Sequence, residues 1–99
     1  MAYTSLSIVV RAGVSTDYGG APASNGAVWV WLKDVAHPQP WHDRYFEVKP
    51  PWGNQVLATA LGAITAGKRV QAHVGDPNVP SERNANGEPY CFRLYVTIE

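Results

Sequence analysis

The chain of 99 residues is long enough for one domain with a modest core, and too short for a substrate domain joined to a cofactor domain. Its eight Lys and Arg residues balance eight Asp and Glu residues, so no long-range field attracts a polyanion, which disfavours nucleic acid as a partner. No apolar run approaches the roughly twenty residues that cross a bilayer, and the N-terminus lacks a signal-peptide pattern. We therefore expect a soluble chain with no membrane span, and its compartment stays open.

The first part of the chain predicts a strand followed by a long loop. Residues 4–11 alternate in the manner of a half-buried strand, with Leu6, Ile8 and Val10 on the apolar face. Residues 14–26 are rich in Gly, Pro, Ser and Asn, which breaks both the strand and the helix periodicity. This segment is therefore expected to be irregular.

The second predicted strand, residues 27–33, is apolar on both faces. One face carries Val28, Val30 and Leu32, and the other carries Trp29 and Trp31. A stiff connector with two prolines at 37–41 leads to a third, shorter strand at 44–48. If the aliphatic face fills a barrel, both indoles must point outward.

Residues 54–66 predict a helix of about three turns. Asn54 is a good N-cap, and Gly67 supplies the left-handed position at the C-terminal end. Apolar residues recur between them at helical spacing, namely Leu57, Ala60, Leu61 and Ile64. The many small residues would let one face of this helix lie close against a barrel.

Two further strands follow the helix, separated by a second irregular loop at 75–89. In the strand at 69–74, Val70, Ala72 and Val74 are expected to face inward. The last strand, 90–98, places Tyr90, Phe92, Leu94, Val96 and Ile98 on one face and Cys91, Arg93, Tyr95 and Thr97 on the other. Cys91 is the only cysteine, and no residue near it in the sequence could act as its base, so we interpret it as a packed thiol.

The order strand, strand, strand, helix, strand, strand is that of the five-stranded OB barrel. We therefore predict an all-β fold with one helix, in which residues 1–99 form a single OB-like domain and the helix lies between the third and fourth strands. OB barrels hold oligosaccharides, oligonucleotides or neighbouring subunits on their surface, and the fold alone does not choose among these uses.

The C-terminal half also resembles a known family. The run LATALGAITAGKRVQAHV at 57–74, followed by CFRLYVTI at 91–98, is similar to a recurrent pattern in small bacterial OB-fold proteins, including the B subunits of AB-type toxins. The resemblance implies a ring of identical subunits, often five, that binds host glycans. This chain departs from the pattern because no earlier cysteine is present to pair with Cys91.

Aromatic side chains beyond those needed for a core are the main functional signal. Trp29 and Trp31 would lie side by side, joined by Arg93 and Tyr95 if the second and last strands approach each other. An exposed aromatic patch of this size indicates a contact surface. Sugar rings and bases stack on indoles, and burial under a loop or a second subunit would satisfy them equally well.

The segment HPQPWHD, residues 37–43, offers two imidazoles and a carboxylate, and His73 could approach it. Metal ligation needs three or four converging donors, and the two prolines oppose convergence, so we interpret this segment as an unliganded polar loop and expect no metal and no cofactor. Trp41 beside His42 and Asp43 would suit a sugar site. Trp52, after two prolines, is expected to cover the barrel below the helix.

Nothing in the spacing of the acidic residues predicts the paired carboxylates of a glycosidase, so we expect no enzyme. The leading hypothesis is a carbohydrate-binding module that acts in a homo-oligomer, similar to a toxin B subunit. Its candidate ligand-binding residues are Trp29, Trp31, Trp41, His42, Asp43, Arg93 and Tyr95. The alternatives are a structural oligomerisation subunit without a small ligand and, ranked below it, a single-strand nucleic-acid-binding OB fold.

Overall fold

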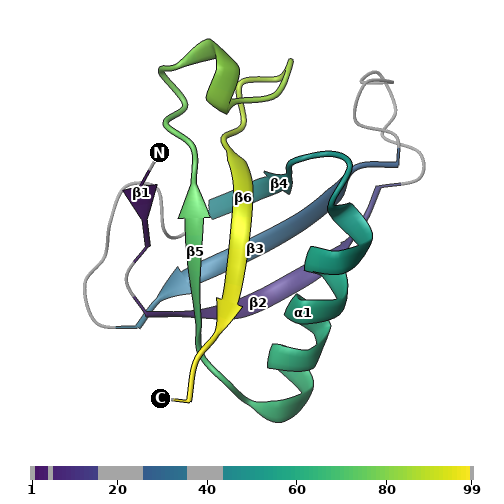
Figure 1. Cartoon of the computed structure of the whole chain (residues 1–99), viewed down its shortest axis with the longest axis vertical. Helices are drawn as coiled ribbons and strands as arrows, with labels where there is room; N and C mark the ends of the chain where they lie inside the picture. Colours follow the sequence, from purple (N-terminus) through teal and green to yellow (C-terminus); the bar gives the residue numbers. More distant parts are fainter. Residues whose placement is uncertain (1, 5, 16–25, 36–43, 99) are drawn as a thin grey trace.

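A computed structural model of the chain describes residues 2–4, 6–15, 26–35 and 44–98 (Figure 1). Its elements in chain order are β1 (Ala2–Tyr3), β2 (Ser7–Val14), β3 (Val28–Asp34), β4 (Arg44–Val48), α1 (Gly53–Ala66), β5 (Val70–Val74), the short 3₁₀ helix η2 (Pro80–Glu82) and β6 (Tyr90–Val96). The predicted helix and the five predicted strands are all present, with β1 and η2 as additions. Within the described residues, no helix is long and apolar enough to span a membrane.

Five strands close into a barrel. β2, β3 and β4 pair antiparallel in that order, β4 pairs in parallel with β6, and β6 pairs antiparallel with β5. In Figure 1, β5 and β6 cross in front of the layer formed by β2, β3 and β4, and α1 lies beside them. The fold is thus an OB-like barrel with one helix between its third and fourth barrel strands, as predicted.

The barrel closes where the N-terminal segment meets β5. β2 contributes one register pair to this contact, Ser7 with Val70, and β1 pairs with the other end of β5. Between them, the buried Thr4 donates its backbone N–H to the Ala72 carbonyl at 2.7 Å, and its Oγ1 accepts the Ala72 N–H at 3.0 Å. A side-chain hydroxyl therefore takes the place of a backbone carbonyl in the ladder at this point.

The core lies inside the barrel and under the helix. Its buried side chains include the predicted inward residues of β3 (Val28, Val30 and Leu32) and of β5 (Val70, Ala72 and Val74). Phe46 and Val48 of β4 complete the same layer. These predictions are confirmed because each of the three strands keeps an uninterrupted period of two.

The first strand has the opposite orientation to the prediction. Ser7 and Val9 are buried, whereas Ile8 and Val10 are about 40 % exposed. Ser7 lies where β2 pairs on one side with β3 and on the other with β5, a crowded position that suits a small side chain. Beyond Val9 the register shifts by one residue at Val10, so Arg11 faces outward as Val10 does, whereas strict alternation would turn it inward.

The last strand also contains a bulge. Cys91 pairs with Val74 and Arg93 pairs with His73, so Phe92 is the extra residue between them. Cys91 is consequently buried in the core, although strict alternation had placed it on the face opposite Leu94. Burial raises the pKa of its thiol to about 12, and the interpretation as a packed thiol is confirmed.

The helix begins at Gly53 and not after Asn54. Its N-cap is Trp52, which makes no side-chain capping hydrogen bond. A Cβ on Gly53 would lie 2.9 Å from Cγ2 of Val28, so the first turn can approach β3 this closely only with glycine there. Trp52 is 57 % exposed, so the prediction that it covers the barrel is wrong. The predicted C-terminus is confirmed, because Gly67 has a φ of 65°.

The buried face of α1 is narrower than predicted. Ala60 and Ala63 are buried, with Val56 and Leu57 packed partly against the core. The other two predicted contacts, Leu61 and Ile64, are 47 % and 44 % exposed. The small alanine side chains allow α1 to pack closely on β2, β3 and β6, which leaves the larger residues at the margin of the contact.

Candidate functional site

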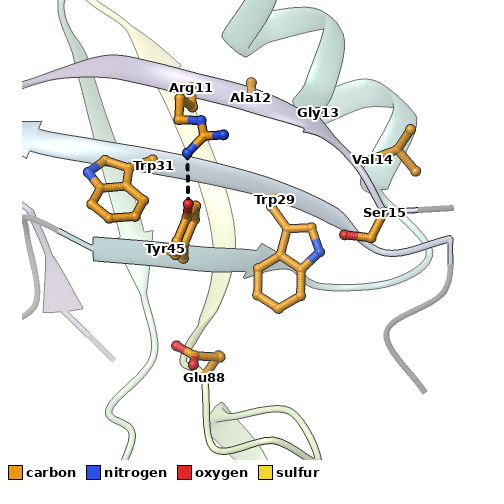
Figure 2. Close-up of a pocket in the computed structure, with 9 residues that line it drawn as sticks. All are labelled: Arg11, Ala12, Gly13, Val14, Ser15, Trp29, Trp31, Tyr45 and Glu88. Atoms are coloured by element: carbon orange, nitrogen blue, oxygen red, sulfur yellow. Dashed lines mark hydrogen bonds between the residues drawn. The ribbon is translucent and has the colours of Figure 1, made fainter. Parts of the chain in front are cut away.

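The outer face of β2, β3 and β4 is hollowed into a cleft of about 330 Å³ (Figure 2). We call it the aromatic cleft, and its principal lining residues are Arg11, Gly13, Trp29, Trp31, Tyr45 and Glu88. In Figure 2 the rings form a row over β3 and β4, with Arg11 on the β2 side and Glu88 on the side of the loop that precedes β6. Strand faces and loops at this position carry ligands in other OB barrels.

The ring row follows from strand register. Trp31 pairs with Tyr45 across β3 and β4, and Trp29 lies one outward position along β3. The Tyr45 ring stands nearly perpendicular to both indoles, with ring centroids 3.9 Å from Trp31 and 6.4 Å from Trp29. Edge-to-face packing of this kind holds the three rings in fixed orientations. Both indoles stay partly exposed toward the cleft.

Arg11 lies at the β2 side of the row. It is exposed, it pairs in register with Trp31, and its Nη1 donates a hydrogen bond to the Tyr45 phenol oxygen at 3.0 Å. That bond orients the guanidinium over the cleft and uses one of its five N–H donors. The bulge at Val10 is what turns Arg11 onto this face.

Gly13 forms the hollow next to Trp29. The two residues are register partners on the outer face, where a larger residue would stand beside the indole. A Cβ built on Gly13 would meet nothing within 4 Å, and the backbone there is not in the left-handed region. The absent side chain is thus not required by backbone conformation, and its effect is to leave room beside the ring.

A buried polar contact fixes the loop wall of the cleft. Asn84 Nδ2 donates to Glu47 Oε1 at 2.7 Å, and both side chains are buried. Asn84 Oδ1 also accepts the backbone N–H groups of Asn86 and Glu88 at 2.9 and 2.8 Å. The segment that carries Glu88 is therefore anchored to β4 and holds its carboxylate at the cleft.

Two predicted site residues lie elsewhere. Arg93 and Tyr95 are on β6, which β4 separates from β3, so they do not meet the tryptophans. They gather instead with Tyr3 and His73 on the outer face of β1, β5 and β6, which we call the tyrosine face. Tyr3 stacks on His73 with centroids 4.5 Å apart, and Arg93 Nη1 donates to the Tyr3 phenol oxygen at 3.4 Å. Hydrogen bonds to Tyr3 and then Tyr95 raise the pKa of Arg93.

The other predicted site residues, Trp41, His42 and Asp43, lie outside the described residues. His73, considered as a partner for that loop, is placed on β5 beside Tyr3. In the part of the chain that the structure describes, no group of three or more His, Cys, Asp or Glu side chains could hold a metal ion.

Sequence reasoning missed four residues of the cleft. Tyr45 could have been predicted from the sequence, because the alternation of residues 44–48 around the inward Phe46 places Tyr45 on the outer face. Arg11 and Gly13 depend on a bulge that leaves no mark on the periodicity, and Glu88 depends on where a long loop folds back. These three needed the tertiary structure.

We found no match to this chain among protein-family models, curated proteins or solved structures. The OB-like fold is compatible with several ligand classes, so the cleft has to be interpreted from its own geometry and chemistry.

Proposed function

We propose that this protein is a non-enzymatic carbohydrate-binding module whose ligand occupies the aromatic cleft. The observation that carries the proposal is a row of three oriented rings in a hollow of about 330 Å³, where the described lining residues contribute one guanidinium and one carboxylate at the border. This volume is near the lower end of small-molecule sites, which span roughly 300 to 1,000 Å³, and it suits one or two sugar rings.

The chemistry of the lining favours a sugar. The C–H face of a pyranose packs against an indole, and Trp29 and Trp31 each offer a partly exposed ring. Sugar hydroxyls both donate and accept hydrogen bonds, so they match the N–H donors of Arg11 and the acceptor oxygens of Glu88. An apolar platform with a few convergent polar groups is the usual form of a small-molecule site.

Nucleic acid is supported less well. Stacking would be equally available to bases, but phosphate backbones need several cations along the strand. Among the described residues that line the cleft, Arg11 is the one cation, and the chain as a whole has no net charge. A purely structural interface is also supported less well, because a flat surface that covers the hollow would remove water from the charged groups at its borders without filling the space between them.

We also propose that the protein forms a homo-oligomer, through a surface other than the aromatic cleft. The tyrosine face exposes Tyr3 and Tyr95 by 49 % and 47 %, and it lies apart from the cleft, so assembly and ligand binding can coexist. Tyr and Arg are enriched in subunit interfaces. Light scattering after size exclusion tests this: we expect Tyr95→Ser to dissociate the assembly and Trp29→Ala to leave it intact. A monomeric wild-type protein would exclude the assembly.

The binding proposal is tested with a glycan array followed by ¹⁵N–¹H NMR titration of the sugars that bind. The four tryptophans give four indole N–H signals, which report separate positions. We expect sugar to shift the signals of Trp29 and Trp31 and to leave Trp52 unchanged, because Trp52 lies at the start of α1. If no sugar on the array shifts either cleft indole at millimolar concentration, the proposal is wrong.

A further inference from the structure

We infer that the sugar bound by the aromatic cleft carries a carboxylate, which pairs with Arg11 while the ring stacks on the aromatic row. This inference rests on the proposed carbohydrate function and adds the class of sugar, an acidic saccharide such as a uronic acid. It is argued from the position, the partners and the charge environment of Arg11.

Arg11 is oriented before any ligand binds. The bond from Nη1 to the Tyr45 phenol oxygen, 3.0 Å long, holds one edge of the guanidinium, and Tyr45 is itself held by its packing against Trp31. The described residues leave the other four N–H donors of Arg11 to a ligand, and these form a planar fork that matches the two oxygens of a carboxylate. Little conformational entropy is then lost when the pair forms, because the guanidinium is already directed at the cleft.

The positive charge of Arg11 has no negative partner among the described residues. The Tyr45 phenol is the hydrogen-bond partner that this part of the chain provides, and a phenol carries no charge. When a sugar ring covers the cleft it removes water from the guanidinium, which weakens its solvation. A carboxylate compensates for this loss better than a neutral hydroxyl, because it brings the opposite charge and accepts two parallel N–H bonds from the guanidinium.

Glu88 restricts how such a ligand can lie. It comes from the loop on the opposite side of the ring row, so the two charged borders of the cleft have opposite signs (Figure 2). A carboxylate at the Glu88 side would be repelled, whereas hydroxyls there can donate to the Glu88 oxygens. The expected orientation therefore has the carboxylate toward β2 and free hydroxyls toward the loop, with one negative charge accommodated in the cleft.

The experiment is an NMR titration with three matched monosaccharide probes that carry at most one charge: methyl galacturonoside, its methyl ester and neutral methyl galactoside. The indole signals of Trp29 and Trp31 report cleft binding. We expect the galacturonoside to bind about tenfold more tightly than the ester, and the difference to shrink as salt is raised. Arg11→Gln should abolish this preference, and Arg11→Lys should keep part of it because the charge remains without the fork.

Lys33→Gln provides the matched control, since it removes one positive charge from an exposed β3 residue that does not line the cleft. We expect it to preserve the preference for the acid. Thermal unfolding of each variant confirms that an exposed substitution has left the fold intact.

The outcomes separate the acidic-sugar inference from the carbohydrate proposal. If all three probes shift the cleft indoles equally and Arg11→Gln changes nothing, the acidic-sugar inference is wrong and the carbohydrate proposal stands. If the acid is preferred equally by wild type and Arg11→Gln, the assignment to Arg11 is wrong. If these probes and every sugar on the glycan array leave the cleft indoles unshifted, both proposals fail together.

Discussion

The aromatic cleft and the tyrosine face have similar composition and different shape. Each combines several aromatic rings with one exposed arginine that donates to a tyrosine phenol, Arg11 to Tyr45 in the first and Arg93 to Tyr3 in the second. On the tyrosine face, Tyr3 lies flat on the His73 ring, so one ring face is already used. In the cleft, Gly13 leaves room beside an indole and a loop forms a wall. A binding site thus depends on a missing side chain and a fixed loop as much as on aromatic content.

The largest effect is expected from Trp31→Ala. Loss of the indole removes a stacking surface and the partner of Tyr45, so sugar affinity should fall by about ten- to a hundredfold. Titration calorimetry with a sugar found on the array measures this. Tyr95→Ala on the tyrosine face is the matched control and should leave affinity unchanged; equal losses in both variants would mean that the two faces are not functionally distinct.

The next largest effect is expected from Asn84→Ala, which removes the anchor of the cleft wall. Glu47 would keep a buried carboxylate without its amide donor, which costs about 1–3 kcal/mol of unfolding free energy. Urea unfolding measures that loss, and sugar affinity should fall as Glu88 loses its fixed position. Asn78→Ala, at an exposed loop position, should do neither. Unchanged stability in Asn84→Ala would show that the loop is held by other contacts.

Gly13→Val separates binding from stability. The new side chain fills the hollow beside Trp29, so binding should be lost, while the strand gains about 0.5–1 kcal/mol because a glycine is removed from its interior. Gly62→Ala in α1 should give a similar gain without any loss of binding, since a Cβ there also meets nothing within 4 Å. Melting temperature and sugar titration together test the pair. Retained binding in Gly13→Val would place the ligand elsewhere.

Tyr3→Phe should have the smallest effect. It removes the phenol that accepts from Arg93 at 3.4 Å but leaves the stacking on His73, and an exposed hydrogen bond of that length contributes at most about 0.5 kcal/mol. Chemical denaturation should show little change, and sugar affinity should show none. A clear drop in affinity would connect the tyrosine face to the ligand.

Much of the fold followed from the sequence because most elements keep a single periodicity. The helix and the inward residues of β3 and β5 could be predicted in this way, as could the outward positions of Trp29 and Trp31. The faces of the first and last strands were predicted wrongly for different reasons. In β2 the inward residues Ser7 and Val9 come before the bulge, so the apolar alternation of Leu6, Ile8 and Val10 marks the exposed face there, and in β6 the bulge at Phe92 puts Cys91 on the same face as Leu94. The position of a bulge depends on how a strand pairs with its neighbours, so it leaves no periodic signal in the sequence.

The candidate site could be predicted only in part, because the sequence pattern reports local alternation and not which strands are neighbours. The indoles were found because alternation along one strand is a local property. Their companions Arg11 and Glu88 come from positions 18 or more residues away from the nearest of them, and strand pairing brings them together. The grouping of Trp31 with Arg93 and Tyr95 assumed that β3 and β6 are neighbours, whereas β4 lies between them.

The closure of the barrel at Thr4 has a consequence for how the protein opens. A ladder that relies there on a hydroxyl has less backbone pairing than the β2–β3 or β5–β6 contacts, so thermal fluctuations should part this seam before the rest of the barrel. Helix α1 packs on β2 and on β6, which lie on the two sides of that seam, and so it restrains the separation. The helix therefore limits the opening of the barrel at this seam. The rate at which the Ala72 amide exchanges with solvent measures how often the seam opens.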